Sequence, residues 1–296
     1  MNSHTAAHPC GGDRPVSRLL ARGLDLTWGD RTLVMGILNT TPDSFSDGGR
    51  YLSADDAVRR GERMVEEGAD LIDIGGESSR PGAEAVPLDE ELRRVLPVLE
   101  ALSRRVSIPL SIDTVKAEVA RRALEAGARL INDISALSFD PKMAPLAAQT
   151  DAAVVLMHAQ GRPRDMQANP VYEDVTKDIA RFFEERLLFA ERQGIPRERI
   201  ILDPGLGFGK NVDHNLEILA RLGDFRALGR PLLLGPSRKS FIGRVLGLSV
   251  GDRLEGTAAA VAAGILNGAS IIRVHDVAAM TRVARMTDAI LRGRHV

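Results

Sequence analysis

The chain has 296 residues, of which 44% are hydrophobic, and its formal net charge at pH 7 is −1. It is long enough for one large domain with a deep core, or for two small ones. The near balance of 39 Lys and Arg against 40 Asp and Glu gives no bulk electrostatic reason to expect nucleic acid or an anionic membrane as partner, which leaves a small molecule as the default substrate.

The first 22 residues read as a flexible leader. They contain no apolar run that could act as a signal peptide, and no later segment has the length and hydrophobicity to span a bilayer. The only cysteine of the chain, Cys10, has no intrachain partner, so neither a disulfide framework nor a cysteine zinc site is available. We therefore expect a cytoplasmic protein.

Short apolar runs and helix-like segments alternate along the rest of the chain. Segments with 3.6-residue periodicity lie between the runs, among them 53–69, 89–105, 114–128 and 175–194, and several end in Gly as helix C-caps do. The runs, in chain order, are 32–38, 70–75, 108–113, 129–134, 152–158, 199–205, 230–235 and 270–275.

This alternation predicts an α/β fold. Strands that are apolar throughout and separated by helices imply a parallel sheet with helices on its outer face, and eight such units in roughly 250 residues are typical of a (β/α)8 TIM barrel. The alternative is an open doubly wound sheet, which would want a Gly-rich turn after its first strand. The stretch GILNTTPDSF (36–45) is not such a turn. With no linker in sight, we expect one barrel domain over residues 23–296.

A barrel should carry its chemistry at the C-terminal ends of the strands. Every one of the eight runs does end in polar residues or in a Gly-rich polar loop. One polar residue at a strand end usually caps the next helix. Capping does not, however, call for Lys239, Arg273 and His275 on the same rim. The chain therefore reads as an enzyme with its active site at that end of the barrel.

The motifs at these strand ends resemble those of the dihydropteroate synthases of folate biosynthesis. They occur in family order from about residue 33 to 276, and the first-loop and second-loop motifs together with SRKSF are the specific ones. They are GILNTTPDSFSDGG, GGESSRPG, SIDT, NDI, VLMH, DPGLGFGK, GPSRKSF and RVHD. The resemblance implies a transferase that joins 6-hydroxymethyl-7,8-dihydropterin diphosphate to p-aminobenzoate and releases diphosphate. It also implies the target of sulfonamides.

A pterin ring has an edge rich in hydrogen-bond donors, so its pocket requires fixed hydrogen-bond acceptors deep in the barrel. Asp113, Asn132 and Asp203 come from three strand ends and could converge there, and Lys239 would donate to the pterin carbonyl and ring nitrogen. Met157 and Phe208 would form apolar walls, although a lone methionine is more often ordinary core. Asp113 and Asp203 could alternatively serve only as helix caps.

The diphosphate end needs cations and a hard metal. Arg273 can grip phosphate oxygens in a planar fork, and His275 and Ser79 would add donors. The resemblance places Asn39 as the protein ligand of Mg²⁺, and one side-chain oxygen with phosphates and waters is ordinary for this ion. The catalytic set would be Asp113, Lys239 and Arg273 together with Asp47 from the first loop.

The second substrate is assigned to the two polar loops. The first loop carries Phe45 and Ser46 on a Gly-terminated lid, and the second carries Arg80 and Pro81. Lys239 and Ser240 complete the expected p-aminobenzoate site. Position 79 is Ser where many relatives have Thr, which keeps the hydroxyl and puts only the packing of the second loop in doubt. We expect loss of diphosphate in an SN1-like step before the arylamine attacks.

Other readings remain open at this point. A pterin-binding methyltransferase would share the barrel but would not explain the first loop and SRKSF together. A phosphate-binding barrel isomerase and a non-catalytic pterin-binding paralogue are further alternatives. The alanine-rich segment 256–269 could pack against a second copy, and the resembling family is usually dimeric, so we expect a homodimer. The same segment could equally be a barrel helix buried against strands.

Overall fold

The structure, a computed structural model of the chain, describes residues 17–41, 54–78, 82–161, 166 and 170–293. Its main sheet has eight parallel strands in the order β8-β7-β6-β5-β4-β3-β10-β9. The strands are β3 (Leu33–Asn39), β4 (Leu71–Gly75), β5 (Leu110–Asp113), β6 (Leu130–Asp133), β7 (Ala153–Met157), β8 (Ile200–Asp203), β9 (Leu233–Leu234) and β10 (Ile271–Val274).

The two edges of this sheet meet. Leu202 of β8 forms a parallel bridge with Leu232, and its backbone N–H donates to the carbonyl of Pro231 at 3.0 Å. The eight strands therefore close, or nearly close, into a TIM barrel, and the sequence-based prediction of this fold is confirmed. Each predicted apolar run contains one strand, with ends that differ by a few residues at most.

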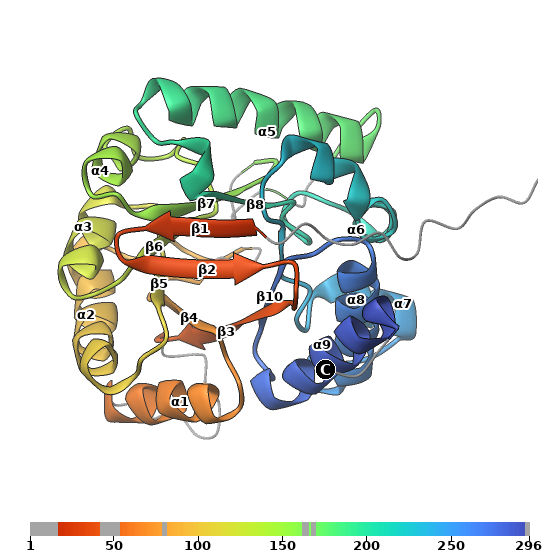
Figure 1. Cartoon of the computed structure of the whole chain (residues 1–296), viewed down its shortest axis with the longest axis horizontal. Coiled ribbons are helices and arrows are strands. Elements are labelled where there is room, and N and C mark those ends of the chain that lie inside the picture. The colour runs from red at the N-terminus through yellow and green to blue at the C-terminus, as the bar shows by residue number, and fades with distance from the viewer. Residues whose placement is uncertain (1–16, 42–53, 79–81, 162–165, 167–169, 294–296) are drawn as a thin grey trace, which may run out of the picture.

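Helices surround the barrel, as Figure 1 shows. Those of the described residues are α1 (Ala54–Glu66), α2 (Leu88–Arg105), α3 (Ala117–Glu125), α4 (Met143–Gln149), α5 (Val175–Arg192), α6 (Val212–Ala220), α7 (Ser240–Leu246), α8 (Leu254–Leu266) and α9 (Val277–Arg292).

A short antiparallel hairpin precedes the barrel. It consists of β1 (Ser17–Ala21) and β2 (Leu24–Trp28), and it lies across one end of the barrel in Figure 1. The prediction of a flexible leader through residue 22 is wrong for Ser17 to Arg22, which form β1 and the start of the hairpin turn. Alternate residues of β1 and β2, such as Leu19 and Leu26, are buried, and burying this apolar stripe against the barrel stabilises a strand there.

Side-chain alternation divides the core into two parts. On β3, Val34 and Leu38 pack outward with the helices, whereas Leu33 and Met35 belong to a separate inner cluster. That inner cluster also holds Leu71, at the start of β4, and the buried side chains of the hairpin. The hairpin thus fills the N-terminal end of the barrel with apolar side chains, and polar side chains of the same alternation lie toward the other end.

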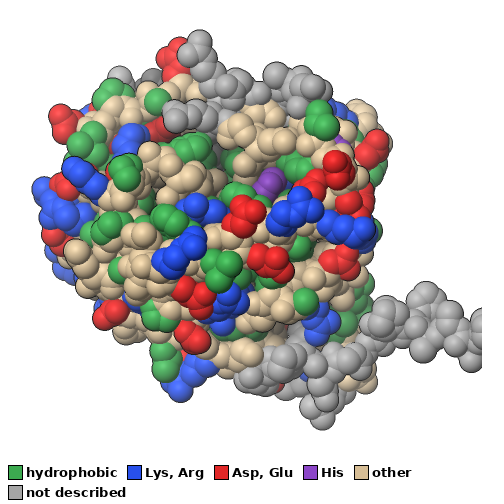
Figure 2. Space-filling model, turned by 90° about the horizontal axis from the view of Figure 1, so that it is seen from above, with side chains coloured by type: hydrophobic (Ala, Val, Ile, Leu, Met, Phe, Trp, Pro, Cys, Tyr) green, Lys and Arg blue, Asp and Glu red, His purple; other side chains and the backbone are tan. Residues whose placement is uncertain are grey.

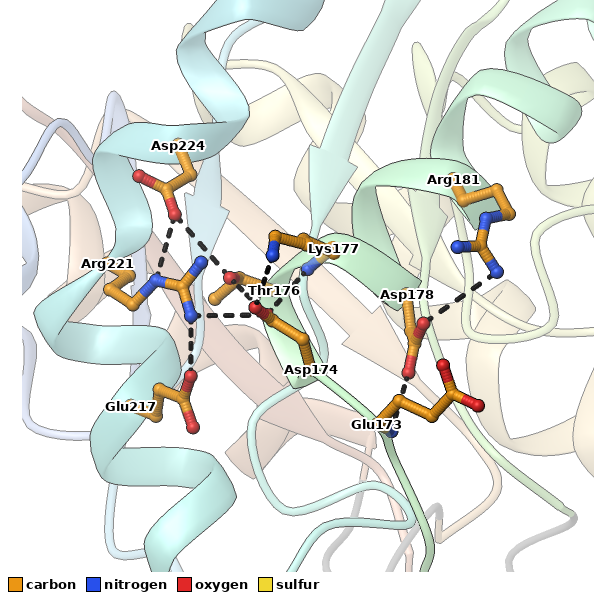
Figure 3. Close-up of polar contacts among 9 residues, drawn as sticks. All are labelled: Glu173, Asp174, Thr176, Lys177, Asp178, Arg181, Glu217, Arg221 and Asp224. Atoms are coloured by element: carbon orange, nitrogen blue, oxygen red, sulfur yellow. Dashed lines mark hydrogen bonds and ion pairs between the residues drawn. The ribbon is translucent and has the colours of Figure 1, made fainter.

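The outer helices are tied to one another by side chains, as Figure 3 shows for α5 and α6. Asp174 caps α5 by accepting a hydrogen bond from the backbone N–H of Lys177 at 3.1 Å. Arg221, which follows α6, donates to the same carboxylate at 3.1 Å and to Glu217 at 2.6 Å. A negative charge at a helix N-terminus and a shared guanidinium together hold these two helices in place.

The alanine-rich segment 256–269 forms most of α8. Its side facing the barrel is packed closely, because a Cβ added to Gly264 would lie 2.2 Å from a methyl carbon of Leu234 on β9. This geometry fits an ordinary barrel helix.

The side of the molecule shown in Figure 2 has Lys and Arg side chains interspersed with Asp and Glu. This mixture agrees with the balanced composition. Among the described residues, no helix is long and apolar enough to cross a membrane.

Candidate active site

A ring of polar side chains lies above the apolar inner cluster. Asp73 on β4 follows Leu71 by two positions, and Asn132 on β6 follows Leu130 by two, so both share the inward direction of those leucines. Asp203 follows Ile201 on β8 in the same way. Strand alternation alone therefore carries polar groups into the barrel at the C-terminal end of the strands.

Arg273 is the centre of this ring. Its Nε donates to Oδ2 of Asp73 at 2.6 Å, and its Nη2 donates to Oδ2 of Asp113 at 2.7 Å. Burial works against its charge, but the Asp73 and Asp113 carboxylates raise the pKa of Arg273 above its ordinary value. Asp73 also accepts from Nδ2 of Asn132 at 2.8 Å. Four strands are thus joined by one charged network.

Opposing influences act on the pKa of Asp113. Burial is the main cause that raises the pKa of Asp113, to about 7, and the neighbouring Asp73, Glu91 and Asp133 raise it further. Arg273 acts in the opposite direction. The carboxyl group therefore titrates near neutral pH, which is where an active-site group is able to change its charge.

Asp203 fixes the turn that follows β8. Its Oδ1 accepts a hydrogen bond from the backbone N–H of Gly205 at 2.7 Å. Gly205 has φ +67°, and a Cβ there would lie 2.0 Å from the carbonyl oxygen of His158, so only glycine fits. Burial raises the pKa of Asp203, whereas Lys239 and the Gly205 N–H lower it.

The loops after β8 and β9 meet at Lys239. Its Nζ donates to the carbonyl of Leu206 and lies 4.3 Å from the centre of the Phe208 ring. Burial lowers the pKa of Lys239 to about 8, while the charges of Asp203 and Asp113 raise it. The lysine therefore sits within electrostatic reach of two of the predicted pterin acceptors.

His275 and Asn39 lie at two neighbouring strand ends. Nδ1 of His275 is 3.0 Å from Oγ of Ser237, which also accepts from the His275 backbone N–H. Asn39 is half-buried at the last position of β3, and its side chain makes no hydrogen bond to the described residues. In the described part of the chain, no group of three His, Cys, Asp or Glu side chains is placed to hold a metal ion.

A second lysine, Lys210, is buried below this loop. Its Nζ lies 2.9 Å from Nδ1 of His158 and donates to the carbonyls of His158 and Phe208, at 3.2 and 2.9 Å. Burial lowers the pKa values of both Lys210 and His158 well below their ordinary ranges. This pair fixes the backbone that carries Phe208.

A cavity of about 820 Å³ adjoins Asp113 on the side of β4 and β6. It lies between the loops that follow β4, β5 and β6, and it is large enough for a small organic molecule. Its walls include Glu77, Ser78, Gly82, Thr114, Lys116 and Phe139.

The structure brings together most of the residues that the sequence indicated. Asp113, Asn132, Asp203, Lys239 and Arg273 belong to the polar ring or contact it. The others with described positions lie at the same end of the barrel. Met157 is buried opposite Asp203 in the strand register, and Phe208 contacts Lys239. Asn39 is the last residue of β3, His275 follows β10 directly, and Ser240 is exposed at the start of α7. Phe45, Ser46, Asp47, Ser79, Arg80 and Pro81 lie outside the described residues.

Sequence reasoning missed Asp73 as a site residue. The signal was present, since Asp73 is an acidic residue within an otherwise apolar strand, and a fully buried carboxylate needs a partner. Ser237 and Lys210 were also missed. Ser237 belongs to the recognised motif GPSRKSF, but nothing in the sequence showed that it contacts His275.

Comparison with known proteins identifies relatives of this chain. Residues 35–275 match the model of the pterin binding enzyme family. A dihydropteroate synthase of Synechocystis is 49% identical over 266 residues, which cover 90% of this chain and 92% of the relative.

Solved structures agree. A Yersinia pestis dihydropteroate synthase in a sulfonamide drug complex superposes with a TM-score of 0.89 at 47% identity, covering 93% of this chain and 99% of that chain. A Xanthomonas albilineans dihydropteroate synthase with 4-aminobenzoic acid gives a TM-score of 0.87 at 47% identity, covering 93% and 98%. Both likenesses extend over the whole barrel.

Proposed function

The chain belongs to the pterin-binding enzyme family and is a transferase of the dihydropteroate synthase type, and from this premise we propose how its residues carry out the reaction. The substrates are 6-hydroxymethyl-7,8-dihydropterin diphosphate and p-aminobenzoate, and the products are 7,8-dihydropteroate and diphosphate. A relative has been solved with 4-aminobenzoic acid, which supports the second substrate. The observation that carries the proposal is the placement of Asp113, Asn132 and Asp203 around one end of the barrel with Lys239 near two of them.

The pterin ring is bound by the polar ring. Asp113 and Asn132 are directly paired in the register of β5 and β6, so their acceptor oxygens can meet adjacent donors on one edge of a flat heterocycle. Asp203 supplies a further acceptor, and Lys239 donates to the opposite edge. The buried side chain of Met157 and the Phe208 ring beside Lys239 form apolar walls.

The diphosphate end is bound by Arg273 and His275, with Asn39 and Ser79 as further contacts. Arg273 already balances two carboxylates, so its position does not depend on the substrate. Asn39 fits a magnesium site, because its amide oxygen is not used by the described residues and Mg²⁺ accepts one protein oxygen together with phosphate oxygens and waters. When bound with the diphosphate, Mg²⁺ would neutralise charge on the leaving group.

The reaction proceeds in an SN1-like manner. Departure of diphosphate leaves a cation at the pterin methylene, which the dihydropterin ring delocalises. Asp113, whose pKa of about 7 leaves it substantially ionised at neutral pH, stabilises this positive charge, and Asp47 from the first loop adds a second carboxylate. Arg273 keeps Asp113 in place. The arylamine nitrogen then forms the new C–N bond and loses a proton to solvent or to released diphosphate.

The arylamine is held at the rim. Lys239 and Ser240 lie where the loop after β9 enters α7, and Phe45, Ser46, Arg80 and Pro81 complete the site from the two polar loops. The two loops exclude water, which would otherwise hydrolyse the cation. The sulfonamide complex of a relative supports inhibition of this site by sulfonamides.

Assembly as a homodimer is part of the proposal. Several large apolar side chains around α7 and α8 are exposed, including Val245 at 53%, Leu246 at 49% and Val250 at 60%. Exposed apolar side chains gathered in one region are typical of a contact surface. A cytoplasmic location stays a prediction.

The test is a synthesis assay with dihydropterin diphosphate, p-aminobenzoate and Mg²⁺, run with and without a chelator. We expect formation of dihydropteroate and diphosphate, loss of product with chelator, and recovery when Mg²⁺ is added back. Pterin binding without turnover would contradict the proposal and would identify a non-catalytic relative. Activity that persists with chelator would contradict the magnesium site alone.

A further inference from the structure

One ion-pair network beside the polar ring has no part in the mechanism above. Lys116, just before α3, forms ion pairs with Glu77, in the loop after β4, and with Glu91, in the first turn of α2. The second contact is 2.5 Å long. Glu91 is fully buried, whereas the side chains of Glu77 and Lys116 keep about a quarter of their surface exposed. A fully buried carboxylate requires a cation or several donors, so Glu91 needs the charge of Lys116 for the stability of the fold.

The ion pair between Lys116 and Glu77 is not required for this reason. Glu77 retains access to solvent and could keep its charge without a partner. Its neighbour Gly76 is already fixed, because Nη1 of Arg94 donates to the Gly76 carbonyl at 2.9 Å and a Cβ on Gly76 would lie 2.7 Å from Val95. Lys116 therefore holds the side chain of Glu77, the residue that directly follows the fixed Gly76.

The same network reaches Asp113. Thr114, the next residue in the chain, donates from Oγ1 to Oε1 of Glu91 at 2.7 Å, and the backbone N–H of Lys116 donates to Thr114 Oγ1 at 3.2 Å. Glu77, Glu91, Thr114 and Lys116 also line the cavity that adjoins Asp113. The loop after β4 and the carboxylate at the end of β5 are thus held at a fixed separation across one wall of this cavity.

We propose that Lys116 is a positioning residue for the second substrate: its ion pair with Glu77 fixes the loop after β4 against the loop after β5, and so sets the width of the cavity entrance beside Asp113. This inference rests on the proposed function, because that function assigns p-aminobenzoate in part to the second loop, which follows β4. Lys116 acts through Glu77, whereas the proposed pterin acceptors Asn132 and Asp203 lie on β6 and β8, outside this ion-pair network.

The test separates the two ion pairs of Lys116. Glu77→Gln reduces the ion pair with the loop to at most one hydrogen bond from Lys116 to a neutral amide, and it leaves the Lys116–Glu91 pair intact, so folding is not at risk from an unpaired buried carboxylate. Lys116→Met removes both ties. In steady-state assays we expect Glu77→Gln to raise the KM for p-aminobenzoate at least tenfold, with less than a twofold change in the Kd of the pterin diphosphate.

A double-mutant cycle and two further variants complete the design. In the double variant Lys116→Met with Glu77→Gln, the KM for p-aminobenzoate should be no higher than in Lys116→Met alone, because both substitutions act on the same Lys116–Glu77 interaction. Lys116→Arg should restore the KM to within threefold. Lys142→Met is the matched control, because Lys142 is an exposed lysine before α4 and should leave both constants unchanged.

Two outcomes would overturn the inference. A p-aminobenzoate KM for Glu77→Gln within twofold of the unsubstituted protein, whatever happens to its melting temperature, would make the pair only structural. Equal losses in pterin affinity and in p-aminobenzoate KM would place the effect in the polar ring. If the unsubstituted protein binds pterin but forms no dihydropteroate, the proposed function itself fails, which the same assays reveal independently.

Discussion

Nε of Arg273 lies 2.6 Å from Oδ2 of Asp73, although the two residues are 200 positions apart in the chain. Asp73 has no exposed surface, and it also accepts from Asn132, so one buried carboxylate orients both a proposed anion-binding group and a proposed pterin acceptor. Its other oxygen, Oδ1, has no hydrogen-bond partner among the described residues. The geometry of the site therefore depends on a residue that the proposed function assigns to neither end of the substrate.

The first prediction concerns this carboxylate. Asp73→Ala leaves the buried guanidinium of Arg273 with one partner and should lower the free energy of unfolding by about 3 to 5 kcal/mol. Chemical denaturation at pH 7.5 measures it. Asp25→Ala, which breaks the exposed pair with Arg18, is the control and should leave the free energy of unfolding nearly unchanged. Equal effects in the two variants would contradict the structural role of Asp73.

Asp203→Asn tests the pterin acceptor. Asparagine keeps an oxygen for the Gly205 N–H, but it loses the charge and turns a donor toward the pterin. Pterin affinity should fall by about 1.5 to 3 kcal/mol, or roughly 10- to 150-fold, while the melting temperature stays nearly constant. Titration calorimetry and thermal unfolding should be run together. An unchanged affinity with a lower melting temperature would show that Asp203 only holds the turn.

Arg273→Ala tests the anion end. Because Arg273 also pairs with Asp113, its removal should weaken binding of the bare hydroxymethylpterin somewhat and binding of the diphosphate substrate much more. We expect the second loss to exceed the first by at least about tenfold, or 1.4 kcal/mol. Direct binding of the two ligands to the same variant measures the difference. Equal losses would mean that the guanidinium does not contact the diphosphate.

Lys239→Met has a pH dependence whose sign follows from burial. The pKa of Lys239 is lowered to about 8 in the folded protein, so below about pH 8 the charge of this lysine opposes folding, by at most about 3 kcal/mol relative to the unfolded chain. The penalty shrinks as pH rises from about 8 toward 10.5. Methionine should therefore stabilise the protein at pH 7, and this advantage should fade between pH 8 and 10.

Unfolding free energies of both proteins at pH 7, 8.5 and 10 measure this effect. The variant should meanwhile lose pterin affinity at every pH. A stability difference that does not change over this pH range would contradict the buried position of the ammonium group.

The order of substrate binding tests the loops. Ordering two polar loops costs about 1 to 2 kcal/mol for each residue fixed, more than p-aminobenzoate alone can supply. It should bind the empty protein feebly and at least about tenfold more tightly once pterin, diphosphate and Mg²⁺ are present. Calorimetric titration of both forms decides it. Asn39→Ala should remove most of the difference, and equal affinities in the unsubstituted protein would contradict closure by the loops.

The barrel could be predicted because the pattern that indicates it, a short apolar run followed by a helical segment, is local and repeats along the chain. Each strand is a short apolar run, and each polar strand end is visible in the chain. Pairings between strand ends are not local: the contact of Asp73 with Arg273 requires the last strand, β10, to pair with β3 beside β4, which no single motif reports. The hairpin was missed for a related reason, since the short apolar stretch around Leu19 and Leu26 has nothing to bury it until the barrel supplies the surface.

That hairpin also decides how molecules enter and leave. It closes the N-terminal end of the barrel with apolar side chains, so a substrate must approach the polar ring from the C-terminal side of the strands. Substrates and product then share one direction of access. In the proposed site the pterin binds deepest, so we expect it to enter before the arylamine and the product to leave with its arylamine end first. A diphosphate that lingers on this side of the barrel would delay both the exit of product and the entry of the next pterin.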